Sequence, residues 1–172
     1  MLAVNNVESF FKGDSTIPQF DDYYANRAKA LQDQLTKPPG SLGRLENIAI
    51  WMAGWQRKTN PTINNPHCLI FAGNHGVATH GVSAYPSDVT AQMIKNFENG
   101  GAAINQLCEL ANLKLSVVPL DLDKPTRDFS QDTAMELEET IAAMQVGFKS
   151  VNAECDLLIL GEMGIGNSTA AT

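Results

Sequence analysis

The residues best suited to chemistry close the sequence, where an apolar run leads into glycines, a carboxylate and small polar side chains. The run Leu157–Leu160 is short enough for a strand buried on both faces. The loop after it contains three glycines: Gly161, Gly164 and Gly166. Asn167-Ser168-Thr169 is typical of a helix start, so backbone N–H groups and the helix dipole could bind an anion there. With Glu162 inside the loop, the pattern predicts chemistry on a phosphorylated small molecule.

This loop matches neither common nucleotide-binding motif. A P-loop requires Gly-Lys-Ser/Thr, and no lysine follows Gly166. A dinucleotide loop requires Gly-x-Gly-x-x-Gly, and only Gly164-Ile165-Gly166 is present. From composition alone, a plain glycine turn remains an alternative to a phosphate site.

A second polar loop, residues 73–86, contains two histidines. His75 and His80 with Asp88 could be considered as metal ligands. Two histidines five residues apart in a loop do not form a helical ligand pair, and no third soft ligand is nearby, so a hydrogen-bonding role is favoured over a metal site. No Gly-x-Ser-x-Gly elbow or reactive Cys–His pair supports covalent catalysis.

The elements that must position these loops alternate along the chain. Apolar runs predict strands at residues 68–72, 113–120 and 157–160, with helices between them at 87–96, 102–111 and 133–152. Because parallel strands need such crossover helices, we expect an α/β fold with a parallel sheet. Ligands then bind beyond the carboxyl ends of the strands, where residues 73–86, 121–132 and 161–169 form three loops. The first and third loops should meet over one crevice if their strands are neighbours.

The first 60 residues have a different organisation. Residues 19–36 and 44–58 read as helices, and the two are separated by the Pro38-Pro39 pair. A polar linker at 59–66 follows, so we divide the chain into 1–60, a helical segment, and 61–172, part of an α/β domain. The last helix has barely one turn, which cannot cover the third strand, so we expect either that the chain is the N-terminal part of a longer protein or that a partner segment completes the sheet.

Composition excludes several classes of protein. The 172 residues are 44% hydrophobic with a net charge of −7, which disfavours nucleic acid as a partner because no basic stripe is present. No apolar run reaches the length of a membrane span, and no signal peptide is recognisable. The three cysteines are odd in number and far apart, as expected in a reducing compartment. We therefore expect a cytoplasmic protein.

Four segments together resemble one known family. They are Lys37–Glu46 (KPPGSLGRLE), Ala72–Val77 (AGNHGV), Gly81–Pro86 (GVSAYP) followed by Val89–Met93 (VTAQM), and Gly161–Thr169 (GEMGIGNST). In this order they resemble nicotinate-nucleotide–dimethylbenzimidazole phosphoribosyltransferases, and the resemblance runs from about Asp33 to Thr172. The resemblance implies a Rossmann-like parallel sheet, a small helical domain made from both chain ends, and a homodimer. Members are about twice this long, so the chain resembles their N-terminal half.

The resemblance also implies a reaction. The family moves 5-phosphoribosyl from nicotinate mononucleotide to 5,6-dimethylbenzimidazole, giving alpha-ribazole 5′-phosphate and nicotinate in the assembly of the cobalamin nucleotide loop. Nicotinate leaves from a cationic ring and needs little acid help, whereas the incoming base must lose its N–H proton to a carboxylate. The remaining task is to position two substrates in line. No metal or other cofactor is implied.

The resemblance assigns site residues only where the motifs match. The nicotinate mononucleotide loop corresponds to Glu162, Met163, Gly164, Gly166, Asn167, Ser168 and Thr169. The benzimidazole pocket corresponds to Tyr85, Pro86 and Met93, and a positioning role falls to Asn74 and His75, where many relatives carry Asp before the His. The family's catalytic base is a late glutamate that lies beyond Thr172, so Glu162 is expected to assist rather than to act as the principal base. Two alternatives stay open: a transferase of the same family that uses another acceptor, such as adenine or a phenol, and a non-catalytic nucleotide-binding module.

Overall fold

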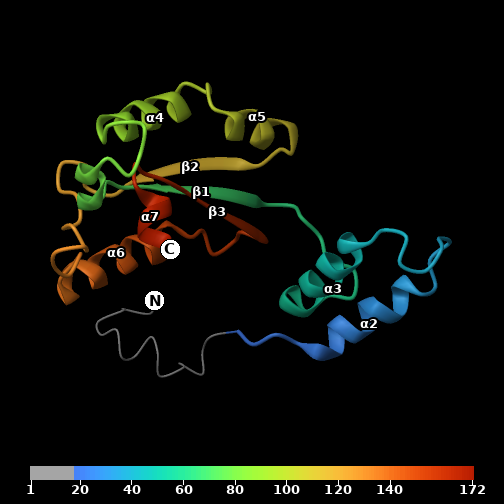
Figure 1. Ribbon diagram of the computed structural model, residues 1–172. Coiled ribbons are helices and arrows are strands. Elements are labelled where there is room, and N and C mark those ends of the chain that lie inside the picture. Colours follow the sequence, from blue (N-terminus) through green and yellow to red (C-terminus); the bar gives the residue numbers. More distant parts are fainter. Residues whose placement is uncertain (1–17) are drawn as a thin grey trace. The chain divides into compact units, whose positions relative to one another are not determined.

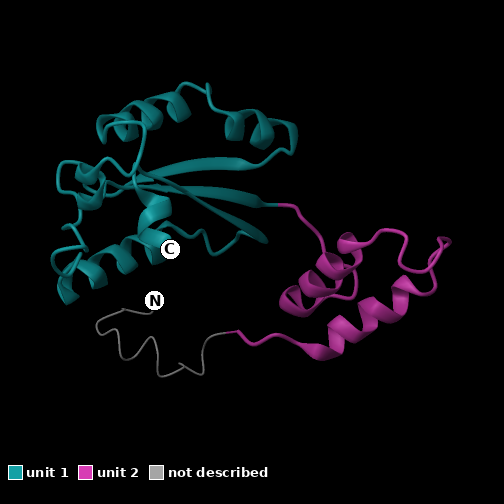
Figure 2. Cartoon of the chain, in the orientation of Figure 1, with its two compact units in different colours: residues 1–7, 65–172 teal, residues 8–64 magenta. Residues whose placement is uncertain are grey.

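The computed structural model describes residues 18–172, which divide into two compact units, residues 18–64 and 65–172 (Figure 2). The linker predicted at residues 59–66 contains this division. The assignment of residues 1–60 to a small helical domain stays a prediction, and residues 1–17 of that segment lie outside the described part.

The first unit is a pair of helices joined by a turn. Helix α2 runs Asp22–Gln32 and α3 runs Arg44–Gln56, so both predicted helices are present, but α2 is shorter than predicted at both ends and α3 ends two residues earlier. Asp21 starts α2 because its carboxylate accepts a hydrogen bond of 3.0 Å from the Tyr23 amide. Glu46 holds the turn between the helices, since Oε1 accepts bonds from Lys37 Nζ at 2.6 Å and from the Leu42 amide at 3.2 Å. The bond from Lys37, followed by that from Leu42, lowers the pKa of Glu46.

The second unit is a three-stranded parallel sheet with helices on its two faces (Figure 1). The strands are β1 Pro66–Ala72, β2 Lys114–Pro119 and β3 Leu157–Met163, in the order β2-β1-β3. Helices α4 (Asp88–Glu98) and α5 (Ala103–Leu110) cover one face, and α6 (Leu137–Ser150) lies on the other. The short helices are η1 (Gly76–His80) and α7 (Asn167–Ala171). The predicted parallel α/β fold is confirmed.

The core of this unit lies between the sheet and the α4–α5 layer. Its buried members are Cys68, Ile70, Phe97, Ala102 and Cys108. Burial and the neighbouring Cys108 thiol raise the pKa of Cys68 to about 11, so this thiol packs as a small apolar side chain. No described helix is long and apolar enough to cross a membrane.

The largest differences from the sequence expectation in this unit are at the end of β3 and the start of α6. Strand β3 continues beyond Leu160 because Gly161, Glu162 and Met163 extend the ladder opposite Ile70, Phe71 and Ala72 of β1, so Glu162 lies in a strand and not in a loop. Helix α6 begins at residue 137 instead of 133, because the Arg127 amide donates to the Ala134 carbonyl at 2.9 Å and keeps that stretch against the loop. The helix start is stabilised at Glu136, whose amide donates to Glu139 Oε2 at 2.8 Å.

Candidate functional site

The three loops expected at the carboxyl ends of the strands are joined by backbone hydrogen bonds. The Gly73 amide donates to the Met163 carbonyl at 3.0 Å, which ties the loop after β1 to the end of β3. On the other side, the Thr126 amide donates to the Asn74 carbonyl at 3.2 Å and the Gly76 amide donates to the Thr126 carbonyl at 2.9 Å. The loop after the central strand therefore lies between the other two loops, and the predicted meeting of the first and third loops is confirmed.

The glycine loop after β3 is packed too closely for larger residues. A Cβ atom on Gly164 would lie within 3.0 Å of the Gly73 carbonyl oxygen and of the Asn167 amide oxygen. Gly166 has φ +94°, a left-handed conformation that side chains rarely adopt, and it starts helix α7. Across the loops, His75 Nε2 hydrogen-bonds Asn167 Oδ1. The loop is thus held in one shape by backbone packing and one side-chain bridge.

Most amides near this loop are already bonded within the protein. The Ile165 amide donates to Thr90 Oγ1 at 3.2 Å, and the Asn167 amide donates to the Gly164 carbonyl at 3.1 Å. The amides of Ser168 and Thr169, in the first turn of α7, have no backbone acceptor among the described residues. Such free amides suit an anion.

A pocket of about 210 Å³ opens over the glycine loop. One wall is the loop itself with the end of β3, and the other is Val82 and Ser83 from the segment before α4. The residues of the first wall are Glu162, Met163, Gly164, Ile165, Gly166, Asn167, Ser168 and Thr169. All seven residues assigned to the mononucleotide loop from the sequence therefore line one pocket. Val82 and Ser83 were missed, although they lie within the Gly81–Pro86 motif.

A larger cleft of about 630 Å³ lies beside this pocket, between the strand ends and helix α6. Glu162 and Asn167 line both cavities, and Asn74 and His75 line the larger one. Its walls are mainly apolar, formed by residues such as Phe71, Leu120, Ala142, Ala143 and Val146. Sequence reasoning pointed to the 121–132 loop but did not predict that α6 would form a wall.

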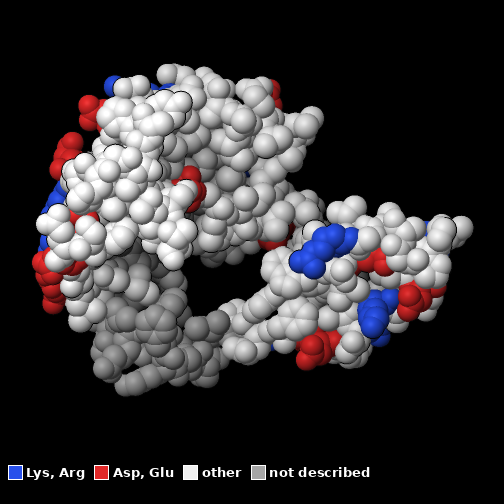
Figure 3. All heavy atoms as spheres, in the orientation of Figure 1, with Lys and Arg blue, Asp and Glu red and all other residues white. Residues whose placement is uncertain are grey.

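The two basic residues that line the larger cleft, Lys124 and Arg127, form ion pairs with carboxylates at the start of α6. Lys124 Nζ lies 3.1 Å from Glu139 Oε1, and Arg127 Nη2 lies 3.0 Å from Glu136 Oε1. The hydrogen bond from the Glu136 amide, followed by that from Lys124, lowers the pKa of Glu139. Figure 3 shows basic and acidic atoms side by side along the edge formed by this loop and α6. The two cations are therefore engaged within the protein.

Three residues assigned to the benzimidazole pocket do not line either cavity. Tyr85 and Pro86 are exposed, with Tyr85 65% accessible, and Met93 packs against the core cluster under α4. Of the segment before α4, Val82 and Ser83 line the small pocket, and Met93 is on the face of α4 that packs against the core. A role for these three residues in binding stays a prediction.

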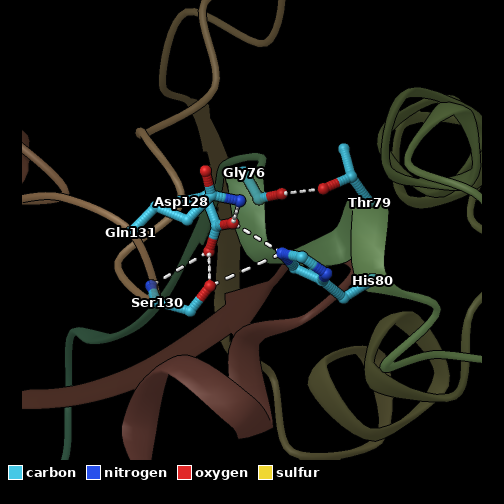
Figure 4. Close-up of polar contacts among 6 residues, drawn as sticks. All are labelled: Gly76, Thr79, His80, Asp128, Ser130 and Gln131. Atoms are coloured by element: carbon cyan, nitrogen blue, oxygen red, sulfur yellow. Dashed lines mark hydrogen bonds and ion pairs between the residues drawn. The ribbon is translucent and has the colours of Figure 1, made fainter.

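His80 pairs with Asp128, and not with the other members of the metal set considered from the sequence (Figure 4). Its Nε2 donates to Asp128 Oδ2 at 2.6 Å, and the same carboxylate accepts bonds from Ser130 and Gln131. The bond from His80, followed by the two from Ser130, lowers the pKa of Asp128 to about 2. In the described part of the chain, no three metal-binding side chains gather in one place. The pair joins η1 to the 121–132 loop.

Replacing the carboxylate should change how stability depends on acid. Because the folded-state pKa of Asp128 is below its usual value of 3.8, its contribution is present above about pH 4 and is lost as pH falls toward 2. Asp128→Asn should therefore lower the free energy of unfolding near neutral pH, and the difference from wild type should shrink between pH 4 and 2. Urea unfolding at several pH values measures this. If the difference in the free energy of unfolding between Asp128→Asn and wild type stays constant from pH 4 to 2, the pKa of Asp128 is not lowered by these bonds.

The fold and the site define a class of protein, the open α/β proteins that bind a nucleotide or phosphate. In such proteins the ligand usually lies at the carboxyl edge of a parallel sheet, where this chain has its glycine loop. The chain belongs to a family of phosphoribosyltransferases, whose family model matches residues 17–172.

Individual relatives carry the name of the same family. The chain is 58% identical over 138 residues to a nicotinate-nucleotide–dimethylbenzimidazole phosphoribosyltransferase of Methylorubrum extorquens, covering 80% of this chain and 40% of the relative. It is 50% identical over 171 residues to the protein of the same name from Rhodobacter capsulatus, covering 99% of this chain and 51% of the relative. A crystal structure of such an enzyme from Thermus thermophilus matches with a TM-score of 0.80 and 36% identity, over 88% of this chain and 52% of that one. The chain spans about half the length of the curated relatives it matches.

Proposed function

We propose that the whole protein transfers 5-phosphoribosyl from nicotinate mononucleotide to 5,6-dimethylbenzimidazole, giving alpha-ribazole 5′-phosphate and nicotinate in the assembly of the cobalamin nucleotide loop. The observation that carries the proposal is the pocket between the glycine loop and the Val82–Ser83 segment. Two of the sequence motifs form its two walls. The activity named for the relatives, and an identity of 50–58%, support the same reaction.

The geometry suits the donor substrate. Free amides at Ser168 and Thr169 can donate to the phosphate, and the close packing of Gly164 against Gly73 and Asn167 holds the loop that carries them. Nicotinate carries its own positive charge in the donor, so the site has to orient the ribose more than it has to protonate a leaving group. The acceptor loses its N–H proton to a carboxylate, which we place in the part of the protein beyond Thr172. We keep Tyr85, Pro86 and Met93 as proposed neighbours of the acceptor, which would be reached through the Ser83 side of the pocket.

Glu162 has the position of an orienting carboxylate. It is exposed, it is the last residue but one of β3, and it lines both cavities. Glu162→Gln should reduce kcat/KM about 10- to 100-fold through weaker binding of the ribose hydroxyls, because a hydrogen bond to a charged group is worth about 1.5–3 kcal/mol. Steady-state release of nicotinate measures the effect, and Glu138→Gln on the exposed start of α6 is the matched control. A complete loss of turnover would instead make Glu162 the principal base.

Assembly and location belong to the same proposal. We propose that the whole protein is a homodimer in the cytoplasm and that residues 1–60 contribute to a small helical domain, with residues 61–172 in the large one. The separation of residues 18–64 from residues 65–172 supports the domain division. No resident cofactor is proposed.

The test is turnover by the whole protein with nicotinate mononucleotide and a panel of acceptors, with the products identified by mass. Alpha-ribazole 5′-phosphate should form fastest with dimethylbenzimidazole. Faster transfer to adenine or a phenol would support another acceptor, and binding without release of nicotinate would support a non-catalytic module.

A further inference from the structure

Thr90 is a polar side chain enclosed in the core beside the proposed site. It lies in the first turn of α4 and is 0% exposed. A buried hydroxyl is normally retained for a hydrogen bond, and Thr90 Oγ1 accepts one of 3.2 Å from the backbone amide of Ile165. Ile165, the middle residue of the glycine loop, is itself 7% exposed. The bond joins residues 75 positions apart in the sequence.

This bond connects the two walls of the small pocket. One wall is Val82 and Ser83, and after four further residues the chain enters α4, which carries Thr90. The other wall is the glycine loop, which carries Ile165. A side chain that ties α4 to this loop therefore fixes the distance between the walls.

The other contacts of the loop act from a different side. Gly164 abuts the Gly73 backbone, and Gly166 lies near Val77 and Ala78, so both contacts come from the loop after β1. Among the side chains of α4 in the described structure, only Thr90 is seen to hydrogen-bond the loop backbone. Because the Ile165 amide donates its hydrogen bond to Thr90, it does not donate to a ligand. The amides of Ser168 and Thr169 are among those still available to bind a ligand in this loop.

We propose that Thr90 is a positioning residue that sets the width of the donor pocket by holding the glycine loop against α4. It touches no substrate. The expected effect of Thr90 on the binding of nicotinate mononucleotide rests on the proposed function. The role of Thr90 in holding the glycine loop does not. Thr90 lies within the Val89–Met93 motif. Met93 is the one residue of that motif to which the sequence assigned a role.

The test compares two variants in the whole protein. Thr90→Val keeps the shape of the side chain and removes the acceptor, which leaves a buried N–H unpaired, so KM for nicotinate mononucleotide should rise about tenfold with a smaller change in kcat. Thr90→Ser keeps the hydroxyl and should stay close to wild type. Thr140→Val is the matched control, because the Thr140 hydroxyl donates within α6 to the Glu136 carbonyl.

A second measurement separates this proposal from the proposed function. Amide hydrogen exchange should show faster exchange at Ile165 in Thr90→Val and near-wild-type exchange in Thr90→Ser. If the wild-type protein releases no nicotinate, the proposed function fails and the exchange result alone decides whether Thr90 holds the loop. An unchanged Ile165 exchange rate would overturn the proposal, and so would a Thr90→Val protein that melts earlier but keeps the wild-type KM.

Discussion

Gly164→Ala should weaken the binding of nicotinate mononucleotide by at least about tenfold. The added methyl group would lie within 3.0 Å of the Gly73 carbonyl oxygen and of the Asn167 side chain, so backbone at the site has to move. Overpacking of this kind costs about 1–3 kcal/mol, and a shift of the loop also disturbs the contact between His75 and Asn167. We expect a fall in affinity of at least about tenfold together with a lower free energy of unfolding. Calorimetric titration and urea unfolding measure the two effects.

The chain offers a matched control for this substitution. Gly147 lies inside α6, and a Cβ atom there would meet no atom within 4 Å. Gly147→Ala should stabilise the protein by about 0.5–1 kcal/mol, since alanine is the better helix former, and should leave binding unchanged. Equal effects of the two substitutions on binding would show that the packing at Gly164 does not shape the site.

Gly76→Ala should be the most destabilising substitution in the loop after β1. A Cβ atom there would lie 2.6 Å from the Thr126 carbonyl oxygen and 2.6 Å from the Asp128 amide nitrogen. Both neighbours are backbone atoms that cannot rotate away, and the Gly76 amide bonds Thr126 at 2.9 Å. We expect a loss of at least about 3 kcal/mol in the free energy of unfolding, the upper end of the range for overpacked sites, measured by urea unfolding.

Gly81, five residues further along, is the comparison for Gly76. It has φ +68° but open space around its Cβ position, so Gly81→Ala should cost only the strain of a left-handed residue, about 1–2 kcal/mol. If Gly81→Ala destabilises the protein more than Gly76→Ala does, the backbone around Gly76 is not packed as closely as the distances to Thr126 and Asp128 indicate. Comparing Gly76→Ala with Gly81→Ala therefore separates the cost of a steric clash from the cost of a left-handed backbone conformation.

The sheet was predictable because its strands are short apolar runs. The run Leu157–Leu160 marked β3 correctly but could not give its end, since Gly161 and Glu162 look like loop residues and only the pairing with Ile70 and Phe71 keeps them in the strand. The start of α6 was misplaced for a related reason. Thr133 is a good helix cap in sequence, but a hydrogen bond from Arg127 to residue 134 holds that stretch outside the helix.

The site was predictable only where one segment forms it. The glycine loop is continuous in sequence, and its seven assigned residues line one pocket. The hold of Thr90 on Ile165 and the pairing of Lys124 with Glu139 depend on the strand order β2-β1-β3 and on which face each helix covers. A single sequence contains no signal for such long-range contacts. The assigned Met93 illustrates the converse, because its place in a motif did not show that it faces the core.

The most direct test of the central claim, that the small pocket binds the phosphoribosyl donor, is to map amide chemical shifts of this chain while nicotinate mononucleotide is added. Nicotinate riboside, which lacks the phosphate, serves as the control ligand. With the mononucleotide, we predict shifts of the amides of Val82, Ser83 and residues 164–169, and a weak binding affinity. With the riboside, we predict much smaller shifts of the same amides. Shifts confined to the larger cleft around Lys124 and Val146, or equal shifts with both ligands, would contradict the claim.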